Sequence, residues 1–280
     1  MLFSIIIPAY NVEDYIEDCL GSISQSLERF HLAQEVEVII VNDGSTDLTW
    51  EKILHVTPRA HVISHIKNQG PPASRNSGVR QASGEYVIFL DADNRLSSNA
   101  LTDIYDTIRS RPQDDAIILG MDIIDPQGKI IGTFYGDKVK VDPQAQLESA
   151  PVLLLLGNFL DNFSVVKRSV FDSLLYDESL QSLEDWDLWV RLLFLRRGQI
   201  SFQPKICGQY RSRTGPKMAP KNRGTLTDIN DVITIYAKIL LLANSCPIPE
   251  QIVDKIYEAM HILSAQLSRS SAYRNWRENA

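Results

Sequence analysis

Two carboxylates one residue apart are the feature of this sequence that most directly suggests chemistry. Asp91 and Asp93 follow at once on the apolar run Tyr86–Leu90, which predicts a buried strand. Carboxylates this close repel each other and need a cation or hydrogen-bond donors beside them. Their hard oxygens suit Mg²⁺ or Mn²⁺, which usually complete their coordination with phosphate oxygens and water. An Asp-x-Asp triplet also occurs in ordinary turns. On position alone, a metal site and a structural turn are therefore equally good interpretations of this triplet.

Three more segments place polar or aromatic groups directly after predicted strands. They contain Pro8, Ala9, Tyr10 and Asn11 after strand Phe3–Ile7, Asp43 after strand Glu37–Val41, and Arg75 after strand Val62–Ile66. Each group alone has a plain structural interpretation, as a turn, a helix cap or a solvated arginine. An arginine here can also meet a phosphate or a carboxylate. Together with the paired aspartates, these groups describe a nucleotide site that includes a divalent cation.

Alternating strands and helices must position these residues. The expected strands are Phe3–Ile7, Glu37–Val41, Val62–Ile66, Tyr86–Leu90 and Ala116–Leu119, and the expected helices occupy 12–27, 45–55, 73–81 and 98–111. This rhythm is typical of an α/β fold with a mostly parallel sheet flanked by helices. Such sheets bind ligands beyond the carboxyl ends of their strands, which is where the polar groups converge.

The second half of the chain has a less regular pattern. The expected elements are strands over 129–134 and 164–167, helical stretches within 145–195, a basic segment over 205–225, and two amphipathic helices over 226–243 and 249–268. The apolar stripes of the last two helices could pack onto the preceding α/β domain, form a homodimer or touch a membrane. Packing onto the domain and dimerisation are the favoured interpretations.

Composition and motif searches exclude several classes of protein. The net charge of −7 argues against a general nucleic-acid binder. The three cysteines have no metal-binding spacing, and no apolar run approaches the roughly 20 residues of a membrane span. The start of the chain lacks signal-peptide features, so we expect a cytoplasmic protein. Motifs of serine hydrolases, zinc proteases, P-loop proteins and dinucleotide-binding dehydrogenases do not occur.

The order and spacing of these segments closely resemble those of inverting family-2 glycosyltransferases with a GT-A fold. The matching segments are SIIIPAYN (4–11), VIIVNDGSTD (38–47), NQGPPASRNSGV (68–79), GEYVIFLDADN (84–94), FSVVKRSVFDSLLYDESL (163–180) and SLEDWDLWVRLL (182–193). The resemblance covers about residues 3 to 213. It implies a GT-A catalytic domain over 1–213, a Rossmann-like nucleotide-diphospho-sugar transferase fold, followed by a C-terminal basic loop and helical extension over 214–280.

The resemblance also implies roles for single residues. Its implied donor-binding residues are Pro8, Ala9, Tyr10 and Asn11 around the nucleotide, Asp43 accepting a hydrogen bond from the base, Arg75 near the base and diphosphate, and Asp91 and Ala92 toward the ribose or sugar. Asp93 is implied to bind the metal on the diphosphate, with Mn²⁺ or Mg²⁺ as cofactor.

The pair Glu184-Asp185 matches the family's Glu-Asp pair, which implies that Asp185 is the general base. Acids are also favoured at a helix N-terminus by the helix dipole, and both interpretations can hold. Glu184, Trp186, Arg211 and Arg213 are candidate acceptor or diphosphate contacts, although Trp186 fits core packing better than sugar stacking.

The sequence departs from the family pattern in two places. Asn94 stands where many relatives have a third acid, and no histidine follows Tyr210-Arg211, where some relatives use one near the diphosphate. Arg211 or Arg213 could supply that charge. The five histidines, at positions 31, 55, 61, 65 and 261, have no ligand-like spacing and are interpreted as surface or helix-end residues. The QxxRW signature of processive synthases is absent, which favours single-sugar transfer.

We therefore predict a metal-dependent, inverting glycosyltransferase that moves a sugar from a nucleotide-diphosphate sugar, most simply a UDP-sugar, to a saccharide or lipid-linked acceptor. The expected setting is cell-surface polysaccharide or glycolipid synthesis, in the cytoplasm or at the inner face of the membrane. A sugar nucleotidyltransferase is the alternative enzyme class, but residues 8–15 lack the glycine-rich basic loop it needs. A catalytically silent sugar-nucleotide-binding module is the third interpretation.

Overall fold

The structure, a computed structural model, describes residues 1–56, 60–133, 154–155, 160–212, 226–244 and 246–269. The α-helices are α1 (Ile16–Arg29), α2 (Thr49–Val56), α3 (Pro71–Gln81), α4 (Ala100–Ser110), α6 (Glu184–Val190), α7 (Leu226–Leu242) and α8 (Glu250–Arg269). The strands are β1 (Phe3–Ala9), β2 (Val36–Asn42), β3 (His61–Ser64), β4 (Tyr86–Phe89), β5 (Arg95–Leu96), β6 (Ala116–Ile124), β7 (Ile130–Thr133), β8 (Ser164–Lys167) and β9 (Ile200–Arg211). Short 3₁₀ turns η1 (Ala33–Glu35) and η3 (Arg168–Asp172) and a π-helical turn η4 (Arg191–Leu195) complete the elements named here.

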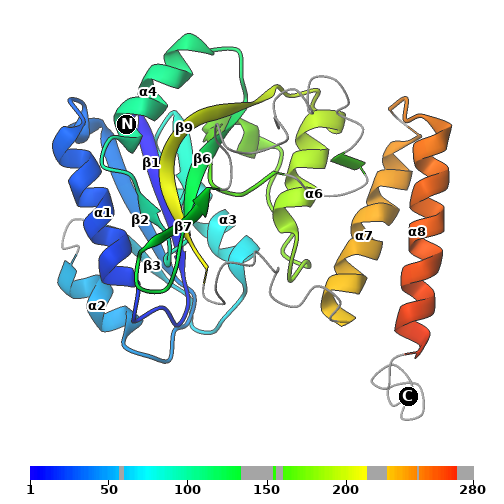
Figure 1. The fold of residues 1–280 in the computed structure, drawn as a ribbon, viewed down its shortest axis with the longest axis horizontal. Coiled ribbons are helices and arrows are strands. Elements are labelled where there is room, and N and C mark those ends of the chain that lie inside the picture. Colours follow the sequence, from blue (N-terminus) through cyan, green and yellow to red (C-terminus); the bar gives the residue numbers. More distant parts are fainter. Residues whose placement is uncertain (57–59, 134–153, 156–159, 213–225, 245, 270–280) are drawn as a thin grey trace.

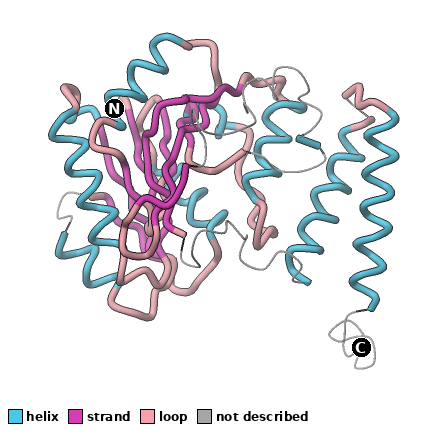
Figure 2. The backbone as a smooth tube through the Cα atoms, viewed as in Figure 1, coloured by secondary structure: helices cyan, strands magenta, loops and turns pink. Residues whose placement is uncertain are grey.

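One sheet forms the centre of the molecule, with helices on both sides (Figures 1 and 2). Its strand order is β3-β2-β1-β4-β8-β6-β9-β5, and β7 pairs with β6. The pairings from β3 to β4 are all parallel, as the sequence predicts. Beyond β4 the sheet is mixed, because β8 runs antiparallel to both β4 and β6 while β9 runs parallel to β6. The fold class is therefore the expected α/β class.

The two faces of the sheet carry separate apolar clusters because side chains alternate along each strand. In β1, Phe3, Ile5 and Ile7 pack with α1, α2 and α4 on one face. Ile6 points to the other face, where the apolar residues of α3, α6, α7 and α8 gather. The strands β1 and β4 are almost fully buried, which explains their continuous apolar runs.

The C-terminal helices form part of the second apolar layer. Ile235 and Ile239 of α7 and Ile256 of α8 are at most 1% exposed and belong to the same cluster as Trp189 of α6. Packing of the C-terminal helices onto the preceding domain, one of the two favoured predictions, is thus observed for α7. Within the described part of the chain, no helix has both the length and the apolar character needed to cross a bilayer.

The parallel strands bring their carboxyl ends to one edge of the sheet. The loops after β1, β2, β3 and β4 all leave from this edge. Because β8 runs antiparallel to β4, the residues that precede β8 lie at the same edge. This edge holds the pocket described next.

Candidate active site

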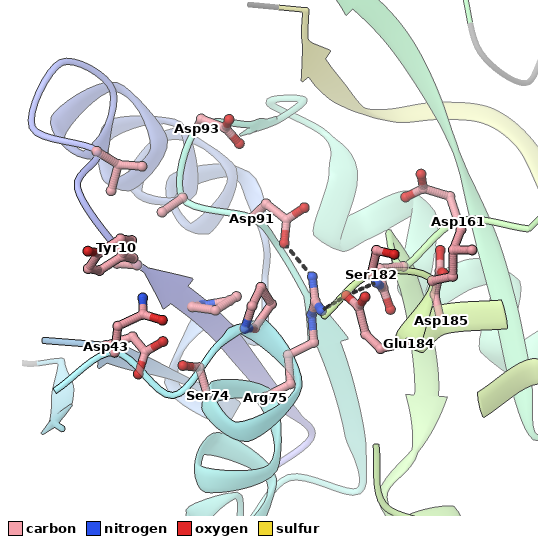
Figure 3. Close-up of a pocket in the computed structure, with 18 of the residues that line it drawn as sticks. Tyr10, Asp43, Ser74, Arg75, Asp91, Asp93, Asp161, Ser182, Glu184 and Asp185 are labelled. Carbon is pink, nitrogen blue, oxygen red and sulfur yellow. Dashed lines mark hydrogen bonds and ion pairs between the residues drawn. The ribbon is translucent and has the colours of Figure 1, made fainter. Parts of the chain in front are cut away.

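A pocket of about 600 Å³ opens at the carboxyl edge of the sheet. It is lined by Pro8, Ala9, Tyr10, Val12, Asp43, Asn68, Pro71, Ser74, Arg75, Asp91, Ala92, Asp93, Asp161, Asn162, Ser182, Leu183, Glu184, Asp185 and Tyr210. Most residues predicted for the site are in this lining. Figure 3 shows Tyr10 and Asp43 at one side of the pocket, Glu184, Asp185 and Asp161 at the other, and Arg75 between them.

The Asp43 carboxylate is fixed by the loop that follows β3. It is 3% exposed and accepts hydrogen bonds from the backbone N–H groups of Gln69 (2.9 Å) and Gly70 (2.8 Å). The His65 ring lies 2.6 Å from the same carboxylate and 3.0 Å from the Ser77 hydroxyl. The interpretation of His65 as a surface residue was therefore wrong, because its side chain is only 9% exposed.

Close backbone packing holds this loop in place beside Asp43. Gly44 has φ +69°, and a Cβ there would lie 2.7 Å from the backbone carbon of Lys67. Only glycine fits this conformation and this approach without strain. The sequence Asp43-Gly44 thus brings the loop after β2 against the loop after β3.

Arg75 joins the two halves of the pocket. Its guanidinium donates to Asp91 Oδ1 at 2.9 Å and to Glu184 Oε1 at 2.5 Å, as the dashed lines of Figure 3 show. Arg75 is the only basic residue among the described residues that line the pocket. Burial alone would lower its pKa, but the Asp91 and Glu184 carboxylates outweigh this effect and raise the pKa of Arg75, which keeps its charge.

The far side of the pocket carries more carboxylates than cations. Burial, together with the charges of Glu184 and Asp161, raises the pKa of Asp185 from 3.8 to about 8. Burial and the charge of Asp91 also raise the pKa of Asp161 to about 6, against the opposing hydrogen bond from the Phe163 N–H. A carboxylate with a pKa near neutrality is a stronger base than an exposed one, which suits general-base chemistry.

These shifts predict that stability falls as the pH rises. Between pH 4 and 8 the folded chain keeps a proton on Asp185 that the unfolded chain has already lost. We therefore expect Asp185→Asn to gain stability relative to the wild type as the pH is raised from 5 to 8. Urea unfolding of both proteins at the two pH values measures this gain. A stability difference that does not change with pH would contradict it.

Hydrogen bonds from Arg211 hold the turn that carries Asp93. The Arg211 side chain is 2% exposed and donates to the Asp93 carbonyl (2.9 Å), the Pro126 carbonyl (2.8 Å) and Asp18 Oδ2 (2.6 Å). The Asn94 side-chain oxygen accepts the backbone N–H of Arg211 at 2.9 Å. The amide at position 94 therefore ties this turn to β9. The structure gives Arg211 a supporting place rather than one in the pocket lining.

Two other candidate residues, Asn11 and Trp186, do not line the pocket, and for Trp186 the structure agrees with the favoured prediction of core packing. Asn11, with φ +48°, bonds through its side chain to Thr46 and so ties the end of β1 to the loop after β2. Trp186 is 2% exposed, and its indole N–H donates to the Leu154 carbonyl at 2.6 Å, which places it in the core. Arg213 lies outside the described residues.

The carboxylates of the pocket are of the kind that hold a divalent cation together with the phosphate oxygens of a bound ligand. Asp93 and Asp91 both line the pocket, and Asp91 is bound to Arg75. In the described ranges, no three acidic, histidine or cysteine side chains come together as a metal cluster. Magnesium and manganese are commonly held by one or two carboxylates with phosphate oxygens completing the shell. The donor set at Asp93 fits this mode.

Sequence reasoning missed Asp161, Asn162 and His65. Asp161 and Asn162 directly precede β8. Their only sequence signal is an acid and an amide before an apolar run, and it becomes informative only when β8 is known to run antiparallel to β4. His65 follows β3 directly, just as Asp43 follows β2, and that shared position is the signal that could have identified it.

Comparison with known proteins gives a family match and several relatives. The model described as "Glycosyl transferase family 2" matches residues 4–172. A GalNAc(5)-diNAcBac-PP-undecaprenol beta-1,3-glucosyltransferase of Campylobacter jejuni is 28% identical over 193 residues, which are 68% of this chain. This chain spans 59% of that protein's length.

Two solved structures share the fold. S. aureus TarS 1–349 in complex with UDP-GlcNAc aligns with a TM-score of 0.69 at 23% identity, over 97% of this chain and 74% of that one. Mannosyltransferase PcManGT from Pyrobaculum calidifontis, in complex with GDP-Man and Mn²⁺, aligns with a TM-score of 0.61 at 16% identity, over 96% and 75% of the two chains. These likenesses show a GT-A fold.

Proposed function

Because this chain belongs to glycosyl transferase family 2, we propose that it transfers a single sugar from a UDP-sugar to an acceptor hydroxyl, with inversion at the anomeric carbon. The observation that carries the proposal is the order of groups across one pocket. Tyr10 and Asp43 lie at one side, the Asp91–Asp93 turn follows, and Asp185 lies at the opposite side (Figure 3). A nucleotide, a diphosphate and an acceptor need these three groups in this order.

The proposed donor site begins at Asp43. Among the described residues, its Oδ1 accepts two hydrogen bonds and its Oδ2 accepts one, so Oδ2 keeps acceptor capacity for a base N–H. Tyr10 is 44% exposed at the pocket wall and offers its ring as a stacking surface for the base. Asp91 would face the ribose or the sugar while Arg75 holds its carboxylate in place.

The proposed chemistry needs one base. Asp185 would take the proton of the acceptor hydroxyl while that oxygen attacks the anomeric carbon from the face opposite the diphosphate. The charge of Glu184, the neighbour of Asp185, would be balanced by its ion pair with Arg75. A divalent cation held at Asp93 would stabilise the negative charge that develops on the leaving diphosphate.

The name of one relative supports the proposed acceptor class. The Campylobacter protein is named for an undecaprenol-linked saccharide, and we propose a lipid-linked or polysaccharide acceptor for this chain, in cell-surface glycan synthesis. Such an acceptor would bring the enzyme to the inner face of the membrane. Contact with the membrane, dimer formation through α7 and α8, and the boundary between catalytic domain and extension near residue 213 stay predictions.

A thermal-shift screen of nucleotide-sugars, with and without Mn²⁺, tests the proposed function. A ligand that binds only the folded state raises the Tm. We expect the largest rise with a UDP-sugar in the presence of Mn²⁺, followed by UDP release on turnover. A screen in which no nucleotide-sugar raises the Tm would overturn the proposal.

The role of Asp93 makes a separate prediction. Asp93→Ala should remove most of the Mn²⁺ dependence of UDP binding, because Asp93 is the proposed protein ligand of the cation that accompanies the diphosphate. Calorimetry with UDP in Mn²⁺ and in EDTA measures the dependence. Asp14→Ala, at an exposed acid outside the pocket lining, is the control and should behave as the wild type. Equal UDP affinity of the wild type in Mn²⁺ and EDTA would contradict the prediction.

A further inference from the structure

One carboxylate of α7 holds the backbone just before the Glu184-Asp185 pair. Asp231 is 6% exposed, and its Oδ2 accepts the backbone N–H groups of Gln181 (3.0 Å) and Ser182 (2.8 Å). The same oxygen also accepts the Ser182 hydroxyl at 3.0 Å. Three donors from one short segment therefore meet a single buried oxygen that comes from about 50 residues further along the chain.

The segment held by Asp231 leads directly into a strained residue. Leu183 precedes α6 with φ +59° and ψ +21°, a left-handed conformation that is costly for a bulky residue that carries a Cβ atom. Such conformations persist only where the surroundings fix them. Leu183 sets the direction in which α6 starts, and Glu184 and Asp185 are its first two residues.

Helix α7 also contacts the residues that follow Asp185. Lys238 Nζ donates to Asp187 Oδ1 at 2.8 Å and also pairs with Asp177. The ring of Tyr236 meets the ring of Trp186 edge-on, with centroids 5.5 Å apart. Asp231 and Lys238 are seven residues apart, which is two helical turns, so they share one face of α7. Figure 1 shows α7 running alongside α6.

We infer that α7 is a positioning element for the general base, and that Asp231 is the residue that sets the backbone in front of it. This inference rests on the proposed function, because it assigns α7 a purpose only if Asp185 takes the acceptor proton. Asp231 itself lies outside the pocket lining and acts through Gln181, Ser182 and Leu183. The C-terminal extension would thus position the general base, rather than form a separate module.

Kinetics of Asp231 variants test the inference. Turnover is measured as UDP release from the UDP-sugar that gives the largest thermal shift. Asp231→Ala should lower kcat by roughly 10- to 100-fold, the scale expected when a reacting group is displaced by about 1 Å. The affinity for UDP with Mn²⁺ should stay within about twofold, since the donor side of the pocket is built by other elements. Asp231→Asn keeps an acceptor oxygen and should recover most of kcat.

Two controls separate positioning from general damage. Asn230→Ala changes the exposed neighbour on the same helix and should leave kcat unchanged. In hydrogen exchange, Asp231→Ala should lose protection at the Gln181 and Ser182 amides while β1 and β4 keep theirs. Full protection of both amides in Asp231→Ala would overturn the inference whatever the activity.

Asp185→Asn distinguishes failure of this inference from failure of the proposed function. If Asp231 acts through the base, Asp231→Ala should cost little further kcat in an Asp185→Asn background. If Asp185→Asn lowers kcat but Asp231→Ala leaves it unchanged, the inference fails and the proposed function stands. If Asp185→Asn itself keeps normal turnover, the base assignment within the proposed function fails, and the inferred role of Asp231 fails with it.

Discussion

Asp185→Asn is expected to lower turnover by roughly 100-fold or more, the usual scale for loss of a positioned base, while UDP affinity stays nearly unchanged. Asparagine keeps the size of the side chain. It also keeps an oxygen that can accept a hydrogen bond from the backbone N–H of Trp186, as Asp185 Oδ1 does at 2.7 Å. It removes the capacity to accept a proton from the acceptor hydroxyl. The change therefore separates shape from basicity.

Steady-state UDP release and calorimetric UDP binding measure the two effects. Asp172→Asn is a matched control, because Asp172 is a 70% exposed acid that forms a distant surface pair with Arg168. It should leave both quantities unchanged. Near-normal turnover of Asp185→Asn would contradict the assignment of Asp185 as the base.

Arg75→Met is expected to destabilise the fold by about 3 to 5 kcal/mol, the cost of breaking a buried ion pair by removing one partner. Arg75 is 3% exposed, and it is bonded to both Asp91 and Glu184. Methionine fills part of the volume but leaves Glu184 buried without its cation. The loss should also weaken donor binding, because Asp91 would no longer be held.

Urea unfolding at pH 7 measures the loss of stability. Arg80→Met is the matched control on the same helix, since Arg80 pairs with Glu178 while about half exposed and should change stability by at most about 1 kcal/mol. Adding Glu184→Gln to Arg75→Met should recover part of the loss, because the buried carboxylate is then removed. A loss below about 1 kcal/mol in Arg75→Met would show that Glu184 and Asp91 do not depend on this cation.

The parallel half of the fold could be predicted because its sequence signals are local. Strands β1 and β4 and the second half of β2 are buried on both faces, so they form short apolar runs in the sequence. The residues that follow them in the chain must then lie at one edge of the sheet. This rule predicts that Asp43, Asp91 and Asp93 lie together, and all three line the pocket.

The other half of the sheet could not be predicted in the same way. Strand β9 carries Gln203, Lys205, Gly208 and Gln209 and lacks a clean alternation, so its sequence indicates only the start of a basic segment. Strand β5 has two residues and exists only through its pairing with β9. Tertiary pairing decides such strands more than their own composition.

Long-range hydrogen bonds were the hardest feature of the site to predict. Arg211 could be recognised as an available cation, but its donation to the Asp93 carbonyl and to Asp18 joins segments more than 100 residues apart. Asp231 gave no sequence signal at all, because an acid on an amphipathic helix usually faces solvent. Its role depends on a contact that only the folded chain brings together.

The anomeric configuration of the product tests the central claim most directly. With an α-linked UDP-sugar as donor, a single displacement assisted by Asp185 must give a β-linked product, and no covalent sugar–enzyme intermediate forms. Proton NMR of the purified product reports this through the coupling constant of the anomeric proton. The account predicts a β-linkage, formed without any α-linked product at early times. A product that retains the α-configuration would contradict it.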